Sequence, residues 1–78
     1  MTGSADLQIY SVDRGIYIRN SSLCSGDIYI YNLLGQLVYS DQLKTSPVTV
    51  INTGIHQGYY IVRVVTPVKV YNQKVYLN

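Results

Sequence analysis

Short apolar runs alternate along the 78-residue chain with clusters of glycine, proline, asparagine, aspartate and serine. Within the runs, aliphatic residues recur at every second position, which is the period of a strand with one buried face. The pattern predicts seven strands, over Leu7–Ser11, Ile16–Asn20, Ile28–Asn32, Gln36–Leu43, Val48–Asn52, Tyr59–Thr66 and Val68–Leu77. Seven short strands at regular intervals are typical of an antiparallel Greek-key sandwich.

Two of these strands need comment because their faces are uneven. Tyr59–Thr66 is apolar on both sides, so we expect it in the middle of a sheet. In Gln36–Leu43, the residues Leu37, Tyr39 and Leu43 share one face while Val38 lies on the other. The pattern therefore leaves the inward face of the fourth strand undecided.

The last strand changes parity along its length. Val68 and Val70 occupy even positions, whereas Val75 and Leu77 occupy odd ones. A strand with one buried face needs an extra or missing residue to bury both pairs, so we expect a β-bulge at Tyr71–Gln73.

Two further expectations concern a turn and an edge. Val12–Gly15 reads as a tight turn in which Gly15 takes a positive φ. The uncharged run Ile28–Leu34 has high β-propensity, so we expect it to be a site of edge-to-edge self-association.

Composition supports the all-β interpretation. The chain has nine tyrosines, many valines and isoleucines, one alanine and no glutamate, and β-branched and aromatic residues favour sheets. A formal charge of +2 from scattered lysines and arginines gives no basis for a nucleic-acid partner. No apolar stretch reaches the length of a membrane-spanning helix.

Candidate chemistry is sparse. His56 is the single histidine and has no nucleophile and acid at a spacing that would favour a catalytic triad. Cys24 is the single cysteine and lies in a polar loop, so we expect a free thiol. The aspartates are scattered and form no calcium loop. We therefore expect no enzyme activity, no catalytic residue, no cofactor and no metal site.

Three motifs stand in order along the chain. Asn32–Gln36 has the form Asn-x-x-Gly-Gln and leads into Leu37-Val38. Gly58, Tyr60, Val62 and Val64 form Gly-x-Tyr-x-Val-x-Val, and Lys74-Val75 lies in the last strand. Together they resemble the type A C-terminal sorting domain of the type IX (Por) secretion system of Bacteroidota. The resemblance extends from about Ile16 to Leu77, although the Pro-Asn-Pro-like start common in that family is absent.

The resemblance implies an immunoglobulin-like sandwich that directs a secreted cargo protein across the outer membrane. It implies export by way of the periplasm to the cell surface or beyond, as the end of a longer precursor with an N-terminal cargo domain. The implied partners are the outer-membrane translocon and a sortase-like peptidase. We expect residues 1–5 to be a linker or expression scar and residues 6–78 to form one sorting domain.

Several residues are candidates within this interpretation. Gly35, Gln36 and Gly58 match the motifs and have expected roles in turns. Tyr60 is placed as the tyrosine corner of an immunoglobulin-like fold, where the phenol bonds to nearby backbone. Arg63, Lys74 and Val75 are the candidates for recognition by the translocon.

Exposed tyrosines suggest a second function. Tyr17, Tyr29, Tyr31 and Tyr39 either pair across strands and support the sheets, or form a platform for sugar rings. The alternative to a sorting domain is accordingly a carbohydrate-binding or adhesion module of a surface protein.

Overall fold

The computed structural model describes residues 7–21, 23–52, 54 and 56–78, so the expected linker at residues 1–5 lies outside the described residues. Seven strands are present: β1 (Leu7–Val12), β2 (Gly15–Asn20), β3 (Gly26–Asn32), β4 (Leu37–Leu43), β5 (Val48–Asn52), β6 (Gly58–Val65) and β7 (Val70–Leu77). No helix in this described part has the length and hydropathy to cross a membrane.

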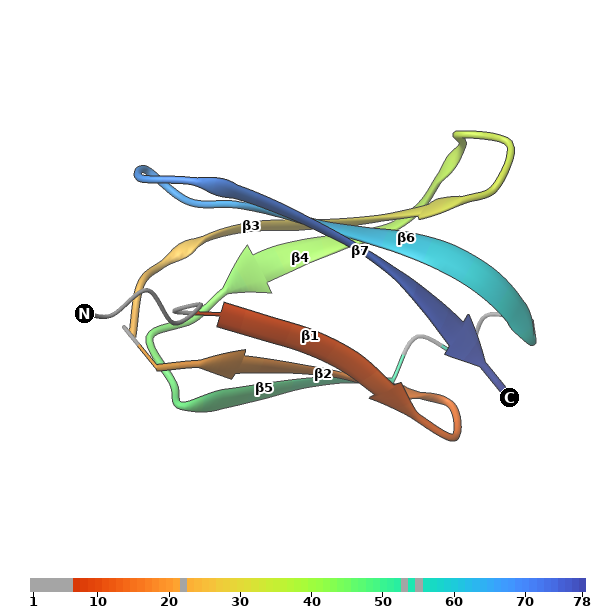
Figure 1. Ribbon diagram of the computed structural model, residues 1–78, viewed down its shortest axis with the longest axis horizontal. Coiled ribbons are helices and arrows are strands. Elements are labelled where there is room, and N and C mark those ends of the chain that lie inside the picture. Colours follow the sequence, from red (N-terminus) through yellow and green to blue (C-terminus); the bar gives the residue numbers. More distant parts are fainter. Residues whose placement is uncertain (1–6, 22, 53, 55) are drawn as a thin grey trace.

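The strands form two layers packed face to face (Figure 1). One sheet has the order β1-β2-β5 and the other β4-β3-β6-β7, and every pairing is antiparallel. The chain crosses between the layers after β2, β4 and β5, which is the connectivity of an immunoglobulin-like sandwich. The predicted all-β sandwich of seven strands is confirmed, and β6 is an interior strand as expected.

The core lies between the layers and is made by alternate residues of the strands. Its fully or nearly buried apolar members are Leu7, Ile16, Ile18, Ile28, Ile30, Leu43, Ile51, Tyr60, Val62, Val64, Val75 and Leu77. Each large aliphatic side chain removed from water contributes about 1.5–3 kcal/mol. These buried residues include the alternate positions that the two-residue period of the sequence had placed on one face of β2, β3 and β6.

The last strand contains no bulge, so that prediction was wrong. Its register with β6 runs without a break from Gly58↔Leu77 to Val65↔Val70. The even-numbered valines do not need an inward position: Val68 lies in the turn before β7 and is 91% exposed, and Val70 lies on the outer face. One unbroken face of β7 supplies Val75 and Leu77 to the core.

The irregularity lies instead between β3 and β4. Ile30 pairs with Tyr39 but the next residue, Tyr31, pairs with Leu37, so Val38 is the extra residue of a β-bulge. The bulge separates Leu37, which follows Tyr31 onto the outer face, from Tyr39, which packs partly against the core. Leu37 therefore does not share a face with Tyr39 and Leu43, contrary to the expectation from the sequence.

Two smaller expectations are also corrected. The positive φ of the first hairpin belongs to Asp13, at 54°, and Gly15 is the buried first residue of β2. The run Ile28–Leu34 is not a free edge, because β3 pairs with β4 on one side and β6 on the other. The free edges of the larger sheet belong to β4 and β7.

Candidate functional site

The segment Asn32–Gln36 is a closed hairpin loop held by one asparagine. Asn32 Oδ1 accepts hydrogen bonds from the backbone N–H groups of Leu34 (2.9 Å) and Gln36 (3.0 Å). Asn32 Nδ2 donates to Gln36 Oε1 at 2.9 Å, and the two backbones bond at 3.0 Å. An asparagine that bonds to the backbone two residues ahead forms an Asx turn. The fixed asparagine and glutamine of the motif therefore build the loop.

Gly35 supplies the backbone conformation that closes this loop. Its φ is +84°, where a side chain adds strain, and its N–H donates to Asn32 O at 3.0 Å. The two variable positions of the motif carry Leu33 and Leu34, whose side chains are 59% and 84% exposed. The loop thus holds two leucines in water at the tip of the β3–β4 hairpin.

Tyr60 ties the start of β6 to the loop before it. Its ring is in the core, and its hydroxyl donates to the backbone oxygen of His56 at 2.8 Å. This is the geometry of a tyrosine corner, in which the phenol bonds to backbone a few residues upstream. Gly58 lies between the two residues with a φ of +142°, a conformation that favours glycine.

Replacing Tyr60 with phenylalanine keeps the buried ring and removes only this hydrogen bond. We expect the free energy of unfolding to fall by about 1 kcal/mol, since that is the net value of one such bond. Urea denaturation followed by far-UV circular dichroism measures the change. Tyr76→Phe is the matched control, because Tyr76 is 45% exposed and no hydrogen bond of its hydroxyl is seen among the described residues. Equal losses in both variants would contradict the tyrosine-corner role.

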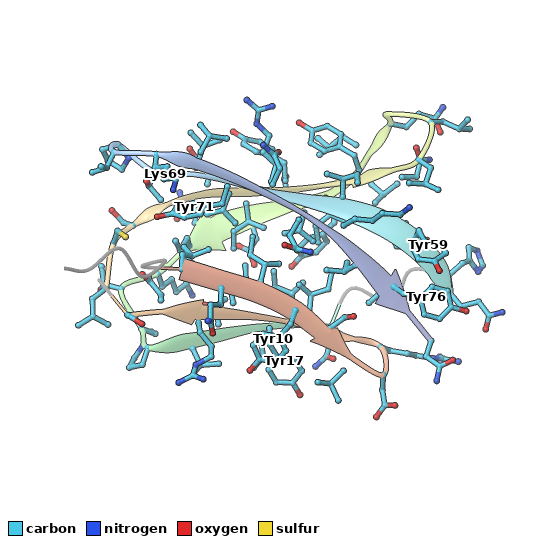
Figure 2. The ribbon with its side chains drawn as sticks, viewed as in Figure 1. Tyr10, Tyr17, Tyr59, Lys69, Tyr71 and Tyr76 are labelled. Atoms are coloured by element: carbon cyan, nitrogen blue, oxygen red, sulfur yellow. The ribbon has the colours of Figure 1, made fainter. Side chains whose placement is uncertain are left out.

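Two of the three candidate recognition residues, Arg63 and Lys74, lie on the outer face of the four-stranded sheet. The rings of Tyr59 and Tyr76 are 4.9 Å apart (Figure 2). Lys74 Nζ sits 4.7 Å from the ring centroid of Tyr59. Arg63 projects from the same face of β6 as Tyr59, two pairs along the β6–β7 ladder from Lys74. We call Tyr59, Arg63, Lys74 and Tyr76 the basic–aromatic cluster.

Val75, the third candidate, lies on the opposite side of β7. Its side chain is 5% exposed and belongs to the core. A partner docked on the folded domain has no access to it, so we remove Val75 from the candidate surface. Lys74-Val75 is instead a pair in which one residue faces solvent and the other anchors the strand.

The tyrosines singled out by the sequence are distributed over several surfaces. Tyr17 lies on the smaller sheet and stacks on its cross-strand neighbour Tyr10, with ring centroids 5.5 Å apart and planes 11° apart. Tyr29 and Tyr31 lie on the outer face of β3, 6.5 Å apart. Tyr39 turns toward the core. The four residues therefore do not form one platform.

The hydroxyl of Tyr39 is bonded at the free edge of β4. It donates to Asp41 Oδ2 at 3.1 Å. This hydrogen bond, with smaller contributions from burial and from the negative charge of Asp41, raises the pKa of Tyr39 above its ordinary value of 10.0. The tyrosine therefore stays neutral at physiological pH.

A buried polar group that the sequence did not suggest connects two loops. Asn20 is 0% exposed, and its Nδ2 donates to the backbone oxygens of Cys24 (2.7 Å) and Lys44 (3.3 Å). Its Oδ1 accepts from Cys24 N (3.1 Å) and lies 3.5 Å from Cys24 Sγ. Its backbone N–H donates to Pro47 O at 2.8 Å. The asparagine thus fixes residues 23–25 against residues 44–47.

The described residues offer little to a catalytic or metal-dependent mechanism. Across residues 7–21, 23–52, 54 and 56–78, no three side chains of histidine, cysteine, aspartate or glutamate gather closely enough to hold a metal ion. Cys24 is a free thiol, and the contact that His56 provides is its backbone oxygen, which holds Tyr60.

Comparison with known proteins agrees with the motifs. Residues 4–78 match the family described as a secretion system C-terminal sorting domain. No curated protein matches the chain. The matched range includes the Asn32–Gln36 loop, the Tyr60 corner and the Lys74-Val75 pair. Because the match covers nearly the whole chain, the protein belongs to the family of type IX secretion C-terminal sorting domains.

Proposed function

We propose that the translocon of the type IX secretion system recognises this domain through the outer face of its four-stranded sheet. As a member of its family, the domain is a C-terminal sorting signal, and it marks a longer cargo protein for export across the outer membrane to the cell surface or beyond.

The observation that carries the proposal is the basic–aromatic cluster. Lys74 lies over Tyr59, Tyr59 packs on Tyr76, and Arg63 projects from the same face. Tyrosine and arginine are enriched where proteins bind one another, because they offer large contact areas with polar ends. A lysine held against a ring already has its side chain ordered, which lowers the entropy lost on binding.

The charge of this face specifies the partner surface. Arg63 and Lys74 are its basic residues, and Asp27 lies at the far end of β3, opposite Val65. A complementary surface on the translocon carries acidic groups facing the two cations and apolar groups facing Tyr59 and Tyr76. We further propose that the sortase-like peptidase acts on the cargo that bears this domain, and that the domain itself, residues 6–78, carries out no catalytic step.

The test is export of a reporter protein fused in front of residues 1–78, in a host that possesses the type IX system. The double variant Arg63→Glu/Lys74→Glu should lower the reporter at the cell surface by about tenfold or more, since like charges across an interface cost several kcal/mol. The reporter should accumulate in the periplasm. Immunoblots of periplasmic, cell-surface and medium fractions give the measurement.

The matched control is Arg14→Glu/Arg19→Glu. Both residues are exposed and lie on the smaller sheet or its hairpin, and the control makes the same change in formal charge, from +2 to −2 (two reversals of two units each). Export should continue in the control at the level of the unaltered domain. Equal loss of export in both double variants would show an effect of net charge, and equal export in all three would exclude this face.

A further inference from the structure

A groove opens between the edge strands of the two sheets. Strands β1 and β7 run in the same direction and lie close at their C-terminal ends (Figure 1). There Ser11 Oγ donates to Tyr76 O at 2.7 Å and Asn78 N donates to Asp13 O at 2.9 Å. Toward their N-terminal ends the strands separate, and a groove of about 560 Å³ lies between residues 7–10 and residues 69–73.

One wall of this groove is the free edge of β7. Along an antiparallel strand, the main-chain groups point alternately toward the partner strand and away from it. The β6–β7 ladder begins with Thr66 N donating to Lys69 O at 2.9 Å, so odd-numbered residues of β7 face β6. The backbone oxygen of Tyr76 accepts from Ser11, outside the β6–β7 pair, which agrees with the even-numbered residues of β7 pointing away from β6. The main-chain groups of Val70 and Asn72 therefore point into the groove.

The other wall is the free edge of β1. Asn20 N donates to Pro47 O, on the side of β2 away from β1, so the pair Leu7↔Asn20 is one whose groups point apart. By the same alternation, the main-chain groups of Leu7 and Ile9 face the groove. Within the described residues, no hydrogen bond from another segment reaches the main chain of these two residues or of Val70 and Asn72.

We propose that this groove binds an extended acidic peptide segment of a partner protein, which pairs as an additional strand with the free edge of β7. Main-chain donors and acceptors at an open sheet edge are the chemistry by which proteins bind extended peptides. The four residues Val70–Gln73 span about 13 Å at ~3.3 Å per residue, enough for four residues of an added strand. The inference does not depend on the proposed function of the outer face.

The side chains that line the groove indicate which kinds of side chain the bound segment carries. Its floor is apolar, formed by Leu7, which is 4% exposed, with Ile9 and Tyr71 packed against the core. Lys69 is the charged residue among those that line the groove, and its Nζ sits 5.3 Å from the ring centroid of Tyr71 (Figure 2). A strand with apolar side chains on one face and a carboxylate near Lys69 complements these features.

The test uses ¹⁵N-labelled chain and a synthetic octapeptide of alternating valine and aspartate. Chemical-shift changes should be confined to residues 7–10 and 69–73, and hydrogen exchange at the amides of Val70 and Asn72 should slow by about tenfold or more. A peptide with lysine in place of aspartate should bind about tenfold more weakly. A peptide with alternate amides N-methylated should not bind, since it lacks the main-chain donors.

Variants of the groove separate the main-chain contribution from the side-chain contribution. Asn72→Pro removes an N–H that faces the free edge, where proline is tolerated, and should abolish the exchange protection that the peptide gives to the Val70 amide. Asn72→Ala keeps the N–H and should bind as the unaltered chain does. Lys69→Glu should reverse the preference between the two charged peptides.

Four results of the peptide experiments would overturn the proposal, and a fifth comes from the chain without peptide. The four are shifts outside the groove, equal binding of the N-methylated peptide, equal weakening by Asn72→Pro and Asn72→Ala, or no binding at millimolar peptide. Protection of Val70 and Asn72 by rising protein concentration without peptide would assign the groove to a second copy of the chain and would overturn it as well.

Discussion

Asn20→Ala is expected to lower the free energy of unfolding by about 3 kcal/mol, because the change removes a fully buried side chain and its three hydrogen bonds to part-buried main-chain groups. The side chain satisfies Cys24 N, Cys24 O and Lys44 O while itself fully buried. A domain of this length has a total stability of roughly 4–12 kcal/mol. The variant should therefore be close to the limit of folding at 37 °C.

Thermal unfolding followed by circular dichroism measures the effect, and a fall in Tm of about 15 °C is expected. Asn20→Asp separates the two halves of the amide. It retains the acceptor for Cys24 N, but it loses the donors to the two carbonyl oxygens and places a carboxylate charge at a buried site. Its loss of stability should therefore equal or exceed that of Asn20→Ala. Asn72→Ala, at an exposed position of β7, is the control for loss of an asparagine side chain. A change in Tm of only a few degrees for Asn20→Ala would contradict the structural role of the network.

The sequence did not reveal this network because one partner is distant along the chain and the nearer one, Cys24, is held through its main-chain groups. Asn20 ends a predicted strand, and an asparagine at a strand end ordinarily indicates a turn. Its role depends on the main chain at residue 44, which is 24 positions away and comes close only when the two sheets pack. A local sequence pattern does not predict which distant backbone groups come together in the folded protein.

The two-residue period was informative where a strand is buried on one face and regular. It placed Ile16 and Ile18, and Ile28 and Ile30, on inward faces, and all four are 0% exposed. It failed at β7 because it treated Val68 as part of the strand, although that residue lies in the turn. A valine is compatible with a strand or with an exposed turn, so parity alone did not separate the two.

The candidate surface was predictable only in part. Arg63 and Lys74 were each expected to be exposed, but their position on one face follows from the register Ile61↔Lys74 and Arg63↔Asn72. That register depends on the Thr66–Lys69 turn, where Thr66 Oγ1 donates to Lys69 O at 2.8 Å. Without the turn geometry, the sequence did not show how residues of β6 and β7 are aligned.

Gly26→Ala is expected to destabilise the domain by about 2–3 kcal/mol through overpacking against the backbone of β6. A Cβ atom at position 26 would lie 2.2 Å from Val65 O and 3.1 Å from Val65 C. These atoms belong to the neighbouring strand of the same sheet, and Asp27↔Val65 is the first pair of the β3–β6 ladder. Relief of the overlap therefore requires the two central strands to separate at this end.

The measurement is urea denaturation, with Ser25→Ala as the matched control. Ser25 is the preceding residue, is exposed and lies outside the strand, so the same methyl side chain should change the stability there by less than about 0.5 kcal/mol. The amides of Asp27 and Val65 should also exchange faster in Gly26→Ala, because the ladder opens at its first pair. Equal stability of the two variants would show that the strands accommodate a side chain at this point. In that case the close approach of β3 to β6 would not be what requires glycine at position 26.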